Sequence, residues 1–428
     1  MLVLASFAFI WLLDPPSLAV VIGLSSFSYA AGLIIYRYPK RLSAYIAALS
    51  GILLLLIFFK YLGMLGGISR SMYLFLESLP GFSLHRLFLP LGISFIVFKE
   101  ISYLTDIRWG LTKPGDFSSH LLYSSLFTIF VAGPIERFER FNPQISGAAI
   151  PFDSGNLSEG SRRIVIGLFK KMVVADWLAF FLTPVWKDPG SYSSLAALAA
   201  FFAYAYQIYY DFAGYSDIAI GASRLFGIRI MENFDKPYLA GNISQFWRRW
   251  HISLSDWIRD YLFFPLSRLS KKKFWNLFLV PLIAMGICGL WHGADSRYIV
   301  WGIWHGLGLS ALQIFNLYKR KAQKTHKQRI KEMMSVAGTP MTVLFVFIGW
   351  LSFRPFGSLL ALRLLMDPVT IAAMLSVFIL LIFVQTPIHR AIAALESISW
   401  RFRHTILLLI LVAASYCAVQ TEFIYAGF

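Results

Sequence analysis

Two Trp-His-Gly triplets lie in an apolar stretch in the second half of the chain, CGLWHGADSRYIVWGIWHG, residues 288–306. They place two imidazoles, His292 and His305, where a polar side chain needs a hydrogen-bond partner, a substrate or water. Neutral imidazole is a base with a pKa near physiological pH, so it suits proton transfer at a reacting hydroxyl. On one continuous helix the two rings would point about 140° apart, which argues against a metal ion bound by this pair alone.

The residues around each histidine predict different roles for the two. His292 ends an apolar run and is followed by Gly-Ala-Asp, residues 293–295, so we expect it at a helix end or break that lines a cavity. His305 lies inside WGIWHGLGLS, which is typical of a core histidine that donates to a neighbouring carbonyl. Close helix packing is expected at three glycines of this segment, 302, 306 and 308.

A third histidine, His251, lies in a segment that is too charged to span a membrane and too aromatic for a loose loop, residues 232–270. Helical spacing predicts one helix over 247–261 with an apolar stripe made of Trp247, Trp250, His251, Leu254, Trp257, Ile258 and Tyr261. The opposite face would carry Arg248, Arg249, Asp256, Arg259 and Asp260. Such a helix fits the membrane interface or a membrane cavity.

Two carboxylates, Asp211 and Asp217, follow the apolar run 195–210 in YYDFAGYSDIAIG. Ionisable groups at membrane depth mark either a functional site or a satisfied structural network. In the structural alternative these carboxylates accept hydrogen bonds from the backbone or from arginines such as Arg224 and Arg229. In the functional alternative they contact substrate.

The elements that must position these residues are membrane helices. Of the 428 residues, 57% are hydrophobic and only 14% are charged, and the mean hydropathy is +0.64. Apolar runs long enough, or nearly so, to cross about 30 Å of hydrocarbon recur roughly ten or eleven times, most clearly at 17–36, 42–59, 275–290, 370–385 and 405–420. We therefore predict an all-α polytopic membrane protein with a single domain, residues 1–428. The first run, MLVLASFAFIWLL, is expected to be a retained membrane segment.

The net charge of +17 is explained by the positive-inside rule, because the basic residues fall in short connections between apolar runs. This pattern places the loops 37–41, 267–273 and 319–331 in the cytoplasm and the last eight residues, 421–428, outside it. It does not favour nucleic-acid binding. Cys288 and Cys417 both lie in apolar runs, so we expect neither a disulfide nor a metal site.

Five ordered motifs together resemble the membrane-bound O-acyltransferase family, in its bacterial branch of alginate O-acetylation, peptidoglycan O-acetylation and teichoic-acid D-alanyl transfer proteins. The motifs are PLGISFIVFKEISYLTDIRWG (90–110), FVAGPIERFERFNPQI (130–145), YYDFAGYSDIAIGASRLFGI (209–228), NFDKPYLAGNISQFWRRWHISLSDWIRDYLFFPL (233–266) and GLWHGADSRYIVWGIWHG (289–306). The resemblance implies a ring of transmembrane and interfacial helices around a central funnel. It also implies a cytoplasmic thioester donor, acetyl-CoA or an acyl carrier protein, and no tightly bound cofactor.

The resemblance assigns the essential histidine to His292 and a second polar position to His251. In this reading His292 is the general base, and His251 holds the thioester carbonyl or stabilises the developing oxyanion. The predicted substrate-binding residues are Trp247, Trp250, Trp291, Asp211 and Asp217. The ending TEFIYAGF is similar to the aromatic tail of polysaccharide-acetylating members, which makes Tyr425 a candidate acyl carrier. The alternative is that Tyr425 and Phe428 are interfacial anchors.

These expectations predict a multi-pass enzyme of a bacterial inner membrane that passes an acyl group, acetyl in the leading hypothesis, outward for O-acylation of a cell-envelope polysaccharide. An extracytoplasmic hydrolase-like (SGNH) transferase would complete the reaction, and membrane lipids surround the chain. D-alanyl transfer from a carrier protein is the alternative within the family. A transporter or flippase for a polar lipid or saccharide is the alternative of another class.

Overall fold

The computed structural model describes residues 1–61, 90–147, 153–293, 295–322 and 328–354, with a few isolated positions beyond. Throughout these ranges the regular structure is helical, as the sequence predicts. The described residues form two compact units. One comprises Met1–Ser161 with Ala219–Met231, and the other comprises Arg162–Ile218 with the residues from Glu232 onward.

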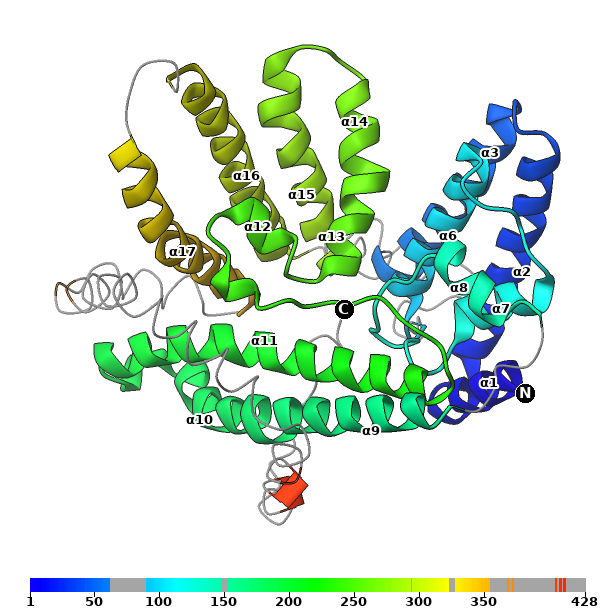
Figure 1. Cartoon of the computed structure of the whole chain (residues 1–428), viewed down its shortest axis with the longest axis horizontal. Coiled ribbons are helices and arrows are strands. Elements are labelled where there is room, and N and C mark those ends of the chain that lie inside the picture. The colour runs from blue at the N-terminus through cyan, green and yellow to red at the C-terminus, as the bar shows by residue number, and fades with distance from the viewer. Residues whose placement is uncertain are drawn as a thin grey trace, which may run out of the picture. The chain divides into compact units, whose positions relative to one another are not determined.

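The first unit contains α1 (Leu2–Leu13), α2 (Pro15–Arg37), α3 (Leu42–Leu56), α6 (Ile93–Trp109), α7 (Phe117–Ser125) and α8 (Phe138–Ile145). Helices α2, α3 and α6 pack side by side (Figure 1). Local chemistry sets their ends. Pro15 opens α2 at a position where its missing N–H is not needed. Gly110 closes α6 in a left-handed conformation that suits a residue without a side chain.

The second unit holds α10 (Asp176–Lys187), α12 (Ile243–Trp247), α13 (Ile252–Ile258), α14 (Phe264–Arg268), α15 (Val280–His292), α16 (Ser296–Ala322) and α17 (Gln328–Trp350). Short π-helical segments join α13 to α14 and precede α15. Two long helices, α9 (Ser154–Leu168) and α11 (Ser194–Leu225), carry residues of both units. α9 continues through the π-helical Phe169–Ala175 into α10, and α11 runs beside this long helix (Figure 1).

Helices α15 and α16 form a tightly packed pair (Figure 1). A Cβ added to Gly302 would collide with the carbonyl oxygen of Met285, and one added to Gly289 would collide with that of Tyr298. Glycines 306 and 308 make similarly close approaches, to the backbone of α15 and to the ring of Phe345 respectively. The close packing expected at the three glycines of WGIWHGLGLS is therefore confirmed.

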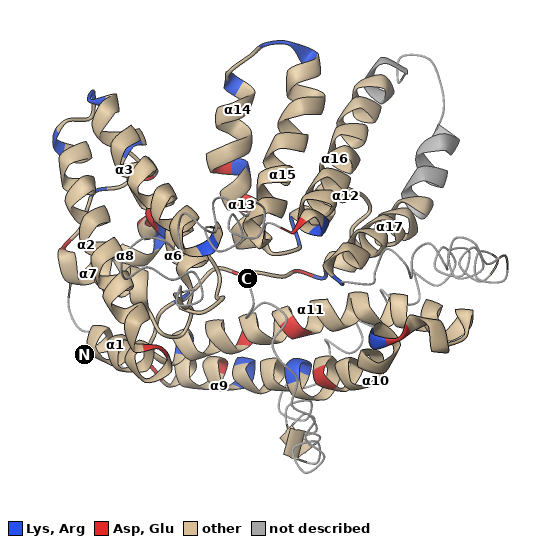
Figure 2. Cartoon of the chain, turned by 180° about the vertical axis from the view of Figure 1, so that it is seen from behind, with Lys and Arg blue, Asp and Glu red and all other residues tan. Residues whose placement is uncertain are grey.

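Four described helices are long and apolar enough to cross a membrane, Pro15–Arg37, Leu42–Tyr61, Trp275–His292 and Ser296–Tyr318. The first three coincide with the apolar runs expected near 17–36, 42–59 and 275–290, and all four fit a membrane protein. Basic residues gather in the loop between α14 and α15, within the segment 267–273 (Figure 2). The runs 370–385 and 405–420 and the tail 421–428 lie outside the described residues, isolated positions apart. Three expectations stay predictions: the ring of transmembrane helices around a central funnel, the side of the membrane on which each loop lies, and the single domain.

Candidate active site

The segment around His251 is broken, so the single helix expected over 247–261 is wrong. α12 ends at Trp247 and α13 begins at Ile252, and between them His251 adopts φ +41°, in the left-handed region that side chains rarely occupy. The amide of Ile252 donates to the carbonyl oxygen of Asn233 at 2.9 Å. This hydrogen bond to a distant residue replaces the one that a continuous helix would make. The stripe residues Trp250 and His251 are nevertheless buried.

Asn233 also orients the His251 ring. Its side-chain oxygen lies 3.1 Å from His251 Nδ1 and accepts from the Ser253 hydroxyl at 2.9 Å. The Asn233 amide nitrogen donates to the Ser216 hydroxyl at 3.2 Å. This hydrogen bond fixes the amide with its oxygen toward the imidazole. Because the oxygen can only accept, Nδ1 carries the proton and Nε2 of the neutral ring presents a lone pair. His251 lies outside the four candidate membrane spans, and burial lowers its pKa to about 3, so the ring is neutral near pH 7.

His292 is the last residue of α15, as expected from the Gly-Ala-Asp segment that follows it. Its buried ring packs among aromatic rings, with centroid distances of 4.8 Å to Trp291, 5.0 Å to Trp301 and 5.3 Å to Phe353. The His251 ring lies 6.5 Å from the same Trp291 ring. The fold therefore brings His251 close to Trp291, the chain neighbour of His292, although residues 251 and 291 are 40 positions apart in the chain.

His305 is fully buried, in agreement with a core position, but the expected hydrogen bond to a carbonyl is not found within the described part of the chain. Neither of its ring nitrogens has a hydrogen-bond partner among the residues that the structure describes. Its neighbours are instead aromatic, with ring centroids at 4.9 Å for Trp301 and 5.2 Å for Trp247. Trp301 thus touches both histidines of the two Trp-His-Gly triplets.

The carboxylates of α11 are held by lysines and an arginine of the α9–α10 helix, not by the arginines expected from the sequence. Asp211 pairs with Lys171 at 2.7 Å, and Asp217 pairs with Lys170 at 2.6 Å and Arg163 at 2.9 Å. Figure 2 shows basic and acidic residues where α11 runs beside α9 and α10. The expectation of Arg224 as a partner is wrong, because it lies about two turns beyond Asp217 on the same helix, and it pairs with Glu159 at 2.8 Å.

These ion pairs predict a stability effect. Asp217→Ala would leave Lys170 and Arg163 partly buried without this carboxylate, and we expect a loss of about 3 kcal/mol in the free energy of unfolding. The measurement is the unfolding midpoint of the detergent-purified protein. Asp256→Ala is the control, because Asp256 pairs with the half-exposed Arg259 and should cost less than about 1 kcal/mol. Equal midpoints for the two variants would contradict a structural role for the Asp217 pairs.

Asn233 and Trp301 were not singled out from the sequence. Asn233 stands 18 positions before His251 in an irregular segment, so no helical or strand period connects them. Trp301 lies between the two histidine triplets, where it looks like one more apolar residue of a membrane helix. The only local indication of an irregular backbone here was the segment 233–237, Asn-Phe-Asp-Lys-Pro, because asparagine, aspartate and proline favour turns.

Comparison with known proteins places this region within a described family. A family model described as "MBOAT, membrane-bound O-acyltransferase family" matches residues 111–348, which include all three histidines discussed above. This match covers more than half of the chain.

Individual relatives extend the likeness over more of the chain. It is 39% identical to the "probable alginate O-acetylase AlgI" of Pseudomonas putida over 64% of this chain and 54% of the relative. It is 32% identical to the peptidoglycan O-acetyltransferase of Helicobacter pylori over 82% of this chain and 70% of the relative. The teichoic acid D-alanyltransferase of Streptococcus thermophilus is 32% identical over 56% of this chain and 60% of the relative. The chain spans about half to two thirds of the alginate O-acetylases that it matches.

Proposed function

Because the chain belongs to the membrane-bound O-acyltransferase family, we propose that it moves an acetyl group from a cytoplasmic thioester donor across the membrane for O-acylation of a cell-envelope polysaccharide. The observation that carries this proposal is the approach of the buried His251 ring to Trp291, which stands next to the buried His292 in the chain. Buried imidazoles beside aromatic rings suit a water-poor site for proton transfer.

The reaction joins an acceptor hydroxyl to the acyl carbon of the thioester. In our proposal His292 takes the hydroxyl proton as the C–O bond forms, the C–S bond breaks, and the thiolate leaves with that proton. We propose for His251 a different role from the one expected from the sequence. Its Nε2 carries a lone pair when Nδ1 donates to Asn233, so a neutral ring accepts a hydrogen bond and does not donate one to an oxyanion. We assign it to orienting the attacking hydroxyl.

Two named relatives support acetyl as the transferred group, since the proteins of P. putida and H. pylori are both named for O-acetylation. D-alanyl transfer from a carrier protein is the second candidate, supported by the S. thermophilus relative. In either case we propose an inner-membrane location and an extracytoplasmic hydrolase-like partner that delivers the group to the final sugar.

Tyr425 lies outside the described residues, and its role as an acyl carrier stays a proposal. Its hydroxyl would accept the acyl group at the His292 site and pass it outward as a tyrosyl ester. Direct transfer at His292 without this intermediate is the alternative.

The test supplies purified protein with acetyl-CoA and follows thiol release and the intact mass. We expect repeated thiol release that depends on an acceptor, and loss of envelope O-acetyl esters in a strain that lacks the protein while saccharide export continues. Retained esters with impaired export would instead indicate a transporter. Tyr425→Phe removes one hydroxyl and keeps the ring: loss of an acyl adduct with unchanged folding supports the carrier role, and full transfer activity ends it.

A further inference from the structure

Arg354 follows the end of α17, and its guanidinium lies among side chains of α10 and α11 in the second unit. Its central carbon is 4.7 Å from the centroid of the Tyr204 ring and 5.7 Å from that of the Trp186 ring. One terminal nitrogen lies 3.5 Å from the side-chain oxygen of Gln207, and Nε has no hydrogen-bond partner in the described part of the chain. Contact with aromatic rings stabilises a guanidinium, but it does not supply the acceptors that its N–H groups need.

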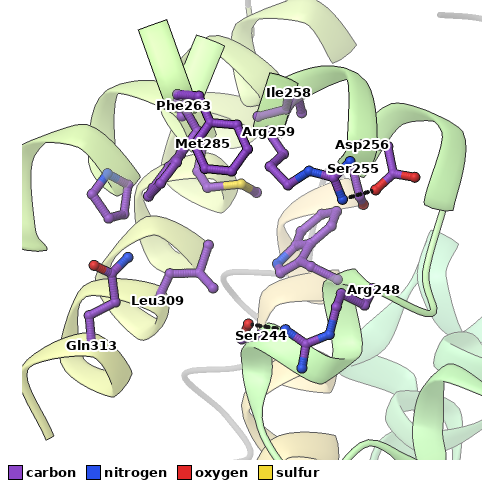
Figure 3. A pocket seen from close by; sticks show the side chains of 14 residues that line it. Ser244, Arg248, Ser255, Asp256, Ile258, Arg259, Phe263, Met285, Leu309 and Gln313 are labelled. Carbon is purple, nitrogen blue, oxygen red and sulfur yellow. Dashed lines mark hydrogen bonds and ion pairs between the residues drawn. The ribbon is translucent and has the colours of Figure 1, made fainter. Parts of the chain in front are cut away.

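The charge of Arg354 is not compensated by any carboxylate among the residues that the structure describes. Two other arginines of this unit show the usual arrangement. Arg259, in the pocket drawn in Figure 3, forms an ion pair with Asp256, and Arg297 of α16 pairs with Asp295 at 3.0 Å. A partly buried guanidinium without a counter-charge predicts a bound anion, and its single charge matches a carboxylate or a phosphodiester.

The indole of Trp186 is a second donor at the same place. The residue is 5% exposed, and its indole nitrogen has no hydrogen-bond partner within the described ranges. Its ring lies 5.3 Å from the Tyr204 ring, which the Arg354 guanidinium also contacts. A buried N–H needs an acceptor, and an oxyanion has enough lone pairs to accept from the indole and the guanidinium together.

These two donors adjoin the residues that surround the candidate base. Phe353, which precedes Arg354 in the chain, has its ring 5.3 Å from the His292 ring and 5.2 Å from the Tyr298 ring. Tyr298 is in turn within electrostatic range of Tyr204. An anion bound at Arg354 therefore suits one part of a substrate whose hydroxyl reaches His292.

The predicted topology indicates from which side of the membrane this anion comes. The helix that ends at His292 starts at Trp275, directly after the loop 267–273, and α17 starts within the segment 319–331. Both segments are expected in the cytoplasm. These helices have 18 and 23 residues, which corresponds to about 27 Å and 35 Å. His292 and Arg354 therefore lie at the helix ends that point away from the cytoplasmic loops, on the side of the acceptor and not of the thioester donor.

We propose that Arg354 and Trp186 form a subsite for a singly charged oxyanion of the acyl acceptor, which makes the acceptor an acidic saccharide. A carboxylate of the saccharide accepts from the guanidinium and the indole while one of its hydroxyls reaches His292. The inference rests on the proposed function, because it names the chemical class of the acceptor. The phosphodiester of an outer-leaflet phospholipid carries the same charge, and the experiment separates the two sources.

The experiment measures binding to the full chain in detergent with two probes that differ only at C6 of each sugar, a β-1,4-linked tetramer of glucuronic acid and cellotetraose. We expect the wild type to bind the acidic tetramer more tightly. Arg354→Gln should weaken this binding about tenfold to a hundredfold and leave the affinity for cellotetraose unchanged. Arg354→Lys keeps the charge without the planar fork, so it should lose less.

Two further variants separate the subsite from general effects on folding. Trp186→Phe keeps a ring and removes the N–H, so it should weaken binding of the acidic tetramer and not of cellotetraose. The matched control is Arg259→Gln, whose charge Asp256 already compensates, and it should change neither affinity. The thermal midpoint of each variant checks that it is folded.

Several outcomes would overturn the proposal. Equal binding of the two tetramers by the wild type, or an unchanged preference in folded Arg354→Gln, would show that no carboxylate is held there. Phosphatidylglycerol that displaces the acidic tetramer and binds more tightly, in an Arg354-dependent manner, would identify a lipid site. Acetyl transfer by the wild type without Arg354-dependent binding refutes the subsite and leaves the proposed function standing. Arg354-dependent binding without any acyl transfer refutes the proposed function alone.

Discussion

His292→Ala is expected to lower the rate of acyl transfer by about 10²- to 10⁴-fold, the range that a positioned general base contributes. The His292 ring closes α15 and packs against Trp291 and Trp301, and its removal leaves both tryptophans in place. Because the ring is buried, its truncation also leaves a cavity, so the loss of transfer is expressed per folded molecule. The measurement is thiol release from acetyl-CoA per folded molecule, with folding checked by the thermal midpoint and by membrane insertion.

The matched control is His305→Ala, because His305 also contacts Trp301 and is equally buried. Its ring fills space among aromatic side chains, so truncation should create a cavity and reduce the amount of folded protein. Activity per folded molecule should change only a few-fold. Wild-type transfer in His292→Ala would remove that residue from the chemistry, and selective loss of transfer in His305→Ala would reverse the two roles.

Asn233→Asp is expected to add to the pH profile of kcat/KM an acid limb due to His251, which the wild type lacks near neutrality. In the wild type, burial holds the His251 pKa at about 3, so Nε2 is available to accept at working pH. A carboxylate in place of the amide oxygen, now 3.1 Å from Nδ1, stabilises the imidazolium and raises that pKa. As pH falls through the raised value, Nε2 becomes protonated and transfer is lost.

A positioning role for Asn233 also predicts which substitution should leave the pH profile of transfer unchanged. Ser253→Ala removes a hydroxyl donor to the same oxygen without adding charge, so it should change the rate modestly and leave the pH profile in place. His251→Ala should lower the rate at every pH. An Asn233→Asp profile identical to that of the wild type would show that the His251 protonation state does not control transfer.

Much of the fold follows from local sequence. The helices Pro15–Arg37, Leu42–Tyr61 and Trp275–His292 coincide with apolar runs, because a span of sufficient length and hydropathy is a property of consecutive residues. The helix end at His292 was likewise predicted from the adjacent glycine, and the α15–α16 packing from Gly302 and its neighbours. In each case the determining residues lie within a few positions of the feature.

The sequence by itself thus determined the membrane helices, the family motifs and the identity of the candidate histidines. The tertiary structure alone decided the break at His251 and the lysine partners of Asp211 and Asp217. These features depend on residues distant in the chain: Asn233 redirects the backbone at Ile252, and α9–α10 brings its lysines to α11. Helical periodicity describes which side of a segment is apolar. It contains no information about which distant donor, acceptor or charge will meet that side, because such partners are set by how helices pack.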